Sequence, residues 1–261
     1  MKIFVMNKWN AILCCFIVIF ALVFVSLNLG DDSIATSNIS KRDLPIYSVA
    51  REDKVVALSF DAAWGNEDTN QLIDILDRFG VKTTFFVVGE WAEKYPDSVK
   101  ALQEAGHEIM NHSDTHPHMN KLSEQQIQQE VSGAEAKITK VTGQKPTLFR
   151  PPYGEYNDTV VSALRDMGYY TIQWNVDSLD WKDLSADEIR RRVMSEVTSG
   201  SIVLFHNAAK HTPEALPAII QDLQAQNYTI VPVSQIILKD NFKIDRTGKQ
   251  VPLISETTSV D

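Results

Sequence analysis

Short apolar runs alternate with longer amphipathic segments between residues 55 and 231, and this alternation predicts strands joined by helices. Runs in which nearly every residue is apolar are typical of buried parallel strands. Such runs occupy residues 55–60, 83–88, 108–110, 147–149, 169–174, 201–205 and 228–231. We therefore expect seven strands, most of them covered on both faces.

Between these runs, apolar residues recur at the spacing of a helix that packs one face on a core. We expect helices over residues 68–79, 96–105, 123–141, 158–167, 185–197 and 213–226. Ser123 with Gln126, and Ser185 with Glu188, have the spacing of a capping box at a helix start. Alternating strands and helices predict an α/β fold with parallel strands, either a closed or partly closed barrel or an open sheet. No glycine-rich phosphate loop follows the first strand, which disfavours a dinucleotide-binding fold.

Residues 11–29 differ from the rest of the chain because they form an apolar run of 19 residues without a single charged side chain. That length is sufficient for a helix to cross a bilayer. Lys2 and Lys8 precede the run, so residues 1–10 are expected in the cytoplasm and the following chain outside the cell. No small-residue cleavage site precedes Gly30, which favours an uncleaved signal-anchor over a removed signal peptide.

The remaining boundaries follow from composition. Residues 30–50 are mostly polar and are expected to be a linker, and residues 51–240 hold the periodic segments of the globular domain. Residues 241–261 lack clear periodicity and are expected to be a C-terminal tail. Hydrophobic residues make up 44% of the chain and charged residues 23%, which excludes wholesale disorder.

Charge and cysteine content exclude several functions. Beyond residue 30 the chain has 23 basic and 34 acidic residues, a net charge of −11. This argues against nucleic acid as the main partner, since a phosphate backbone requires a basic surface. Both cysteines, Cys14 and Cys15, lie in the apolar run. Residues 31–261 therefore contain no disulfide, thiol nucleophile or thiolate metal ligand.

Reactive side chains cluster at the predicted carboxyl ends of the strands. In α/β folds this edge of the sheet carries the active site. The residues concerned are Asp61 after the first strand, His112 and His116 after the third, Arg150 after the fourth, Asp177 and Asp180 after the fifth, and His206 after the sixth.

Each of these residues has a chemical interpretation and a purely structural one. Asp61 can act as a general base on water. The structural alternative is that Asp61 caps the next helix, but Asn66 or Asp68 is better placed for that role. His112 and His116 are four residues apart and can share a metal, although a polar loop without a ligand has the same sequence. Pro117 disfavours a helix at His116 and so indicates a loop.

Two further segments carry charged residues near these positions. Arg150 begins the rigid sequence RPPYG and is suited to orient the Asp61 carboxylate, although a structural turn would also contain these residues. The segments DSLDW and LFH bring an acidic residue and His206 to neighbouring strand ends. A carboxylate beside an imidazole raises its pKa, which makes His206 a candidate proton donor. The structural alternative is that His206 and Trp181 are buried core residues whose polar atoms are hydrogen-bonded.

Taken in order, the segments SFDAAWG, HSDTH, RPPYG, DSLDW and LFH resemble those of the polysaccharide deacetylases of carbohydrate esterase family 4, the NodB-homology domain. The resemblance covers residues 55–233. It implies a distorted (β/α)7 barrel, similar to a TIM barrel, and metal-dependent removal of N-acetyl groups from amino-sugar polymers. The expected partner is cell-wall glycan, with peptidoglycan favoured over chitin-type oligomers.

The resemblance also implies roles for individual residues. They are Asp61 as general base, His112 and His116 as metal ligands, Arg150 as the residue orienting the base, the Tyr153 N–H as an oxyanion donor, Asp180 as the carboxylate that tunes the acid, His206 as general acid, and Trp181 and Leu204 as walls of the acetyl pocket. The metal implied is a divalent ion, with Zn²⁺ favoured.

One position departs from the family pattern. The family usually has a second aspartate, a metal ligand, where this chain has Ala62. Losing an anionic ligand should weaken binding of a divalent cation. Asp61, Asp114 or His118 are the candidate third ligands, and a two-histidine site with more water is the alternative. Ala62 therefore keeps a second function open, a membrane-anchored glycan-binding protein with impaired catalysis. An O-acetyl esterase is a third, because N- and O-deacetylation pass through a similar oxyanion.

Overall fold

The computed structural model describes residues 42–253 of the 261-residue chain. Within the described residues, 43–253 belong to one compact unit by their contacts. The predicted membrane segment, residues 11–29, lies outside the described residues. Among residues 42–253, no helix combines the length and apolar character needed to cross a membrane.

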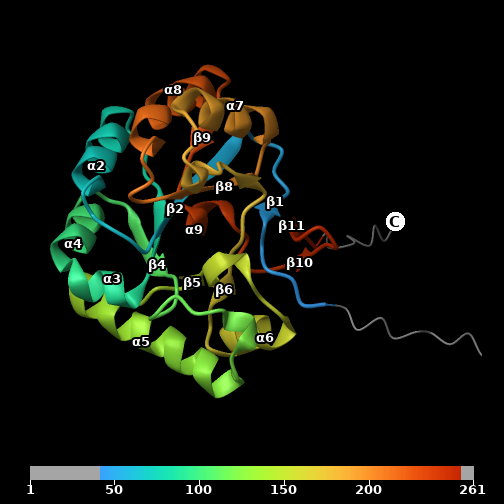
Figure 1. Cartoon of the computed structure of the whole chain (residues 1–261). Helices are drawn as coiled ribbons and strands as arrows, with labels where there is room; N and C mark the ends of the chain where they lie inside the picture. Colours follow the sequence, from blue (N-terminus) through green and yellow to red (C-terminus); the bar gives the residue numbers. More distant parts are fainter. Residues whose placement is uncertain (1–41, 254–261) are drawn as a thin grey trace, which may run out of the picture. The chain divides into compact units, whose positions relative to one another are not determined.

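The main sheet consists of parallel strands and curls, with helices around its outside (Figure 1). Its strands lie in the order β6-β5-β4-β3-β2-β8-β7, and β9 pairs with the start of β2 off this path. The bounds are β2 Val55–Ala62, β3 Thr84–Val87, β4 Glu108–Asn111, β5 Leu148–Phe149, β6 Tyr170–Thr171, β7 Val176–Asp177, β8 Ile202–His206 and β9 Thr229–Ile230.

This order agrees with the expected distorted barrel, because the strands follow one another around the sheet in chain order. No β6–β7 ladder joins the two edges within the described residues. The prediction missed the two-residue strand β7, which lies only four residues beyond β6. The seventh predicted strand, at residues 228–231, is present as β9, but it extends the amino end of β2.

All six expected helices are present, and two short ones, α3 and α9, were not expected. Both predicted capping boxes are formed, at Ser123 and Ser185. The helices are α2 Thr69–Arg78, α3 Gly89–Lys94, α4 Pro96–Glu104, α5 Glu124–Thr142, α6 Asp158–Asp166, α7 Ala186–Glu196, α8 Thr212–Ala225 and α9 Val233–Ile236. The described part of the chain also contains three single-turn 3-10 helices: η1 Met119–Lys121, η2 Pro152–Gly154 and η3 Asp180–Lys182.

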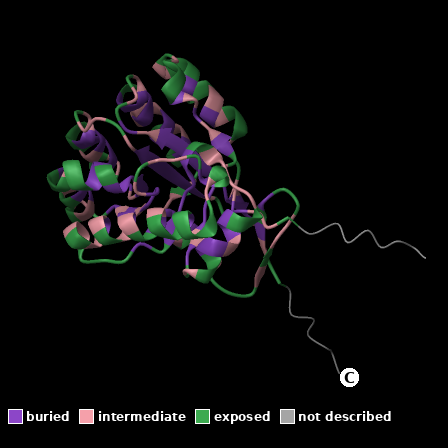
Figure 2. Cartoon of the chain, turned by 60° about the horizontal axis from the view of Figure 1, so that its bottom comes forward, coloured by how far each residue is buried: buried purple, intermediate pink, exposed green. Residues whose placement is uncertain are grey.

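Alternate residues of β2 face different parts of the core. Leu58 and Phe60 belong to the large apolar cluster that includes the helices, whereas Ala57 belongs to a second cluster with Phe86 and α9. Successive side chains of a strand point to opposite faces of the sheet, which explains this division. Figure 2 shows the buried strands surrounded by helices whose outer faces are exposed. The same alternation places Ser59 and Asp61 on the face of Ala57.

The structured unit extends beyond the predicted boundaries at residues 51 and 240. Strand β1, Ser48–Val49, pairs with β11, Lys249–Pro252, which in turn pairs with β10, Phe242–Ile244. Just before β1, Ile46 forms a bridge with Ile172 beside β6. Ser48, the first residue of β1, forms a bridge with Ser201 beside β8. These parts of the predicted linker and tail are therefore ordered against the domain, and the N-terminal segment lies at the open edge of the sheet.

Candidate active site

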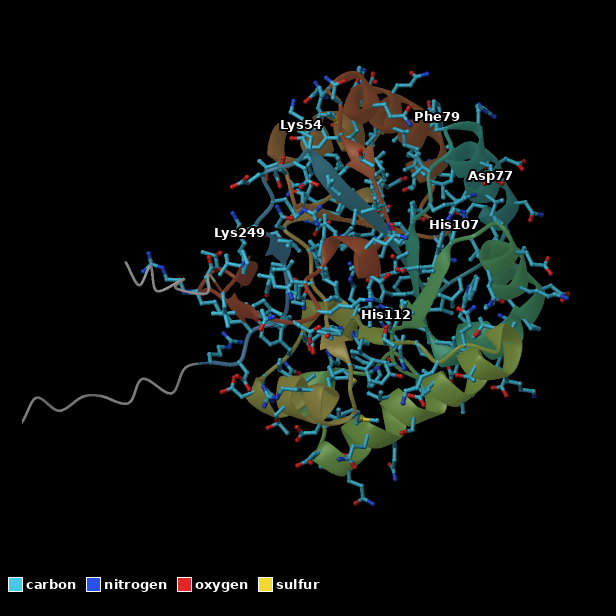
Figure 3. All side chains as sticks on the ribbon, turned by 180° about the vertical axis from the view of Figure 1, so that it is seen from behind. Lys54, Asp77, Phe79, His107, His112 and Lys249 are labelled. Carbon is cyan, nitrogen blue, oxygen red and sulfur yellow. The ribbon has the colours of Figure 1, made fainter. Side chains whose placement is uncertain are left out.

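The predicted site residues lie at one edge of the main sheet. Asp61 and His206 stand near the carboxyl ends of β2 and β8, where they are partners in the parallel register. His112 directly follows β4, and Arg150 directly follows β5. His107 and His112, both labelled in Figure 3, lie at the two ends of β4, so only His112 reaches this edge.

Asp61 and Arg150 form a buried ion pair. Arg150 Nη1 donates to Asp61 Oδ1 at 2.8 Å, and its Nη2 donates to Ser59 Oγ at 2.8 Å. The guanidinium carbon also lies 4.1 Å from the centre of the Phe86 ring. Burial alone would raise the pKa of Asp61, but the positive charge of Arg150 lowers it below the usual 3.8. Asp61 is therefore ionised at neutral pH.

His112 is oriented by the backbone of the Arg150 loop. Its Nδ1 lies 2.7 Å from the Arg150 carbonyl oxygen, and its Nε2 lies 3.5 Å from Asp61 Oδ2. Because a carbonyl oxygen only accepts, we assign the ring proton to Nδ1, which leaves the Nε2 lone pair facing the site. Burial lowers the pKa of His112 and keeps the ring neutral.

His116 lies beside His112, with 5.0 Å between the ring centres. Its backbone is in the left-handed region at φ 60°, an uncommon conformation for a residue with a side chain. Burial lowers the pKa of His116 to about 4. Both imidazoles are thus neutral at neutral pH, the form that binds metal.

Helix α5 holds the loop that carries these histidines. Glu130 accepts hydrogen bonds from the backbone N–H of Asp114 and Thr115, at 3.0 and 2.8 Å, and from the Thr115 hydroxyl at 2.8 Å. Within the loop, the His116 N–H donates to Ser113 Oγ at 3.0 Å. These bonds compensate for the left-handed backbone at Ser113 and His116.

The donor set fits a divalent cation only in part. The two neutral imidazoles fit, and the Asp61 carboxylate lies 3.5 Å from His112 Nε2. Ala62 is fully buried and offers no ligand atom. Asp114 pairs with Lys137 at 3.0 Å, and His118 bonds Glu155 at 2.8 Å. Within residues 42–253, no cluster of three or more potential ligands is formed.

His206 and Asp180 form the second buried pair of the site. His206 Nδ1 lies 2.7 Å from Asp180 Oδ1, and the His206 backbone N–H donates to Asp180 Oδ2 at 2.8 Å. The Thr212 hydroxyl donates to the same oxygen at 2.7 Å. Burial alone would lower the pKa of His206, but the bond to Asp180 and its negative charge raise it above 6.5. The imidazole therefore keeps its proton to higher pH than a free histidine.

The three residues expected to contact substrate differ in exposure. Tyr153 has φ 59° and is 56% exposed, and Trp181 is 57% exposed. Leu204 is buried, and it alternates along β8 with Val203 and Phe205, which belong to the large apolar cluster that includes the helices. Leu204 therefore lies on the same face of β8 as His206.

Sequence reasoning missed three supporting residues. Ser59 bonds Arg150 and stands two positions before Asp61 on one strand, so period-two spacing would have indicated it. Asn207 directly follows His206, and its side chain bonds the loop after β2. Thr212 contacts Asp180 from the start of α8, and no local signal indicates that contact.

Comparisons with known proteins agree with this geometry. A family profile described as "Polysaccharide deacetylase" matches residues 48–172. The peptidoglycan-N-acetylmuramic acid deacetylase PdaA of Bacillus subtilis is 30% identical over 213 residues, which cover 80% of each chain. The peptidoglycan-N-acetylglucosamine deacetylase PgdA of Listeria monocytogenes serotype 1/2a is 34% identical over 218 residues, which cover 81% of this chain.

A solved structure from Bacillus anthracis is described as a CE4 family pseudoenzyme. It has a TM-score of 0.72 and 36% identity, covering 74% of this chain and 68% of its own. A mutant of the same pseudoenzyme, described as having restored enzymatic activity, also has a TM-score of 0.72. This chain spans about half the length of some curated relatives, with 46% of PgdA and 40% of PdaC of Bacillus subtilis covered. The matched profile, the relatives and the shared fold show that the chain belongs to the polysaccharide deacetylase family, CE4.

Proposed function

We propose that this chain removes N-acetyl groups from cell-wall glycan, with peptidoglycan as the favoured substrate. The observation that carries the proposal is the pairing of Asp61 with His206 in the register of β2 and β8. Arg150 keeps Asp61 ionised, and Asp180 helps His206 to keep its proton. A base and an acid side by side, in opposite protonation states at one pH, suit the hydrolysis of an amide.

In this proposal Asp61 takes a proton from water, whose oxygen forms a bond to the acetyl carbon. The backbone N–H of Tyr153 donates to the resulting oxyanion. His206 then gives its proton to the sugar nitrogen as the carbon–nitrogen bond breaks, which yields acetate and a free amine. Arg150 and Asp180 hold the base and the acid, and Trp181 and Leu204 flank the acetyl methyl.

His112 and His116 would hold a divalent cation, and we favour Zn²⁺ because both ligands are imidazoles. When bound, the cation supplies positive charge that polarises the acetamide carbonyl. With Ala62 in place of a carboxylate, we expect weaker binding than in a three-ligand site. Residues 11–29 would anchor the chain in the membrane, with the catalytic domain outside facing the wall.

A glycan-binding protein without turnover is the second candidate. Ala62 favours it because the expected third ligand is absent, and one structurally similar protein is described as a pseudoenzyme. An O-acetyl esterase is the third, since ester and amide hydrolysis pass through similar oxyanions. The intact pairs of Asp61 with Arg150 and His206 with Asp180 favour an active hydrolase over the binding protein.

Acetate release by the full chain tests these candidates. Peptidoglycan, chitin oligomers and acetylxylan would each be incubated metal-free, with Zn²⁺ and with Co²⁺, beside the Asp61→Asn variant. We expect metal-dependent release from peptidoglycan that is lost in the variant. Release from acetylxylan alone would support the esterase, and binding of glycan without release under any metal would support the binding protein.

A further inference from the structure

Exposed aromatic side chains gather at the edge of the sheet that carries the site. Among residues 42–253, the large apolar side chains that are more than half exposed are Trp64, Tyr153, Trp181 and Leu253. The three aromatic ones follow the carboxyl ends of β2, β5 and β7. Tyr153 and Trp181 already have proposed contacts with the acetyl group and its oxyanion, whereas Trp64 has no assigned role.

The backbone at Trp64 is held firmly although its side chain is exposed. The carbonyl oxygen of Gly65 accepts hydrogen bonds from Trp91 Nε1 and from Asn207 Nδ2, both at 2.7 Å, and the same two groups donate to the Trp64 carbonyl oxygen. Asn207 Oδ1 accepts from the Ala63 N–H at 3.1 Å. The exposed ring is thus presented from a fixed loop, which lowers the entropic cost of binding a ligand on it.

The same bonds tie Trp64 to the proposed catalytic residues. The Asn207 N–H donates to the Asp61 carbonyl oxygen at 3.1 Å, and Asn207 is the neighbour of His206. The Trp64 ring centre lies 5.5 Å from that of His116, which in turn lies 4.5 Å from Tyr153. His116 therefore lies between two exposed aromatic rings, and Trp64 lies beside a residue of the proposed site.

Polar groups lie beside at least one of these aromatic rings. His118 stacks on Tyr153 at 4.6 Å and bonds Glu155 at 2.8 Å, so hydrogen-bonding groups adjoin the exposed Tyr153 ring. Protein–protein sites are commonly marked by a broad contiguous apolar patch rather than by rings set among polar groups. A pyranose sugar has an apolar C–H face and a polar rim of hydroxyl groups, which matches rings set among polar side chains.

We propose that Trp64 is a sugar-binding platform for the residue next to the one that is deacetylated, in a chain of N-acetylated amino sugars. The identity of the glycan rests on the proposed function, but the platform requires only binding and not turnover. The substrate is then a polymer segment, with one sugar at the acetyl pocket and its neighbour on the Trp64 ring.

Calorimetric titration of the full chain with the monomer, dimer and tetramer of N-acetylglucosamine tests the platform. We expect Trp64→Ala to weaken binding of the dimer and tetramer about tenfold and to leave binding of the monomer unchanged. Trp64→Phe should retain most of the affinity because a flat ring remains. Leu253→Ala, a matched loss of an exposed apolar side chain at the end of β11, should bind every oligomer as the wild type does.

Equal affinity of wild type and Trp64→Ala for the tetramer would overturn the platform, as would equal weakening for all three lengths. A wild-type chain that binds none of the oligomers would overturn it too. Acetate release separates this inference from the proposed function. Length-dependent binding lost in Trp64→Ala, without acetate release by the wild type, would support the platform and contradict the deacetylase.

Discussion

Arg150 Nη1 lies 2.8 Å from Asp61 Oδ1, and the two side chains are 0% and 7% exposed. An ion pair removed from water in this way gains little net stability, because desolvation of both charges offsets their attraction. Its value lies in holding an ionised carboxylate at a defined position beside His112. Removing one partner should therefore lower the free energy of unfolding more than removing both.

The Arg150→Met variant should lower the free energy of unfolding by about 3–5 kcal/mol, because it leaves Asp61 buried without its cation. The double variant Asp61→Asn with Arg150→Met should recover part of that loss, since neither charge remains. Urea unfolding at pH 7 measures both. A double variant less stable than Arg150→Met alone would contradict the pairing.

The pH dependence of acetate release should be bell-shaped. The rate should rise as Asp61 ionises, below its usual pKa of 3.8, and fall as His206 loses its proton, above 6.5. Asp180→Asn removes the charge that raises the pKa of His206, so the basic limb of kcat/KM should move to lower pH. An unmoved limb in that variant would exclude His206 as the proton donor.

Stability should depend on pH through His107, at the end of β4 away from the site. Burial lowers its pKa from 6.5 to about 4, so the folded protein takes up this proton at lower pH than the unfolded chain does. The contribution of neutral His107 to the free energy of unfolding is fully present above pH 6.5. It declines as pH falls towards 4, by about 3 kcal/mol in total. Unfolding free energies of wild type and His107→Phe at pH 7 and 4.5 check this. The variant should lose less stability between the two pH values.

Glu130→Ala should impair the site from a distance. Without three acceptor contacts, the loop from Asp114 to Thr115 loses its anchor on α5, and His116 loses its fixed position. We expect a 10–100-fold loss of Zn²⁺ affinity, of the size found when an outer partner of a metal ligand is removed. Metal titration measures this. Glu124→Ala, at the exposed start of the same helix, should bind Zn²⁺ as the wild type does.

Two glycines with the same backbone angle should respond differently to substitution. Gly200 has φ 83° and Gly168 has φ 82°, but an added Cβ would lie 1.7 Å from the Val49 carbonyl oxygen at Gly200 and would meet nothing within 4 Å at Gly168. Gly168→Ala should lower the free energy of unfolding by about 1–2 kcal/mol, the penalty for placing a residue with a side chain in a left-handed conformation. Gly200→Ala should cost clearly more, because β1 must move away. Equal losses in urea unfolding would contradict the close approach.

Local patterns were sufficient to predict most elements and the edge that holds the site. The six helices and both capping boxes depend on residues within one or two helical turns of each other, so the local sequence is sufficient to predict them. The placement of Asp61, His112, Arg150 and His206 followed from a general property of parallel strands, whose carboxyl ends lie at one edge. The resemblance in five short motifs then indicated the chemistry.

Only the tertiary structure decided which distant groups meet. The bridge of Ile46 to Ile172, and the pairing of β1 with β11, join segments far apart in sequence that carry no local strand pattern. The hydrogen bonds of Asn207 to the Trp64 loop, and the turning of Asp114 towards Lys137, depend equally on how elements pack. Side-chain periodicity reports which face of an element is buried, but not which partner covers it, because partner choice depends on the packing of the whole domain.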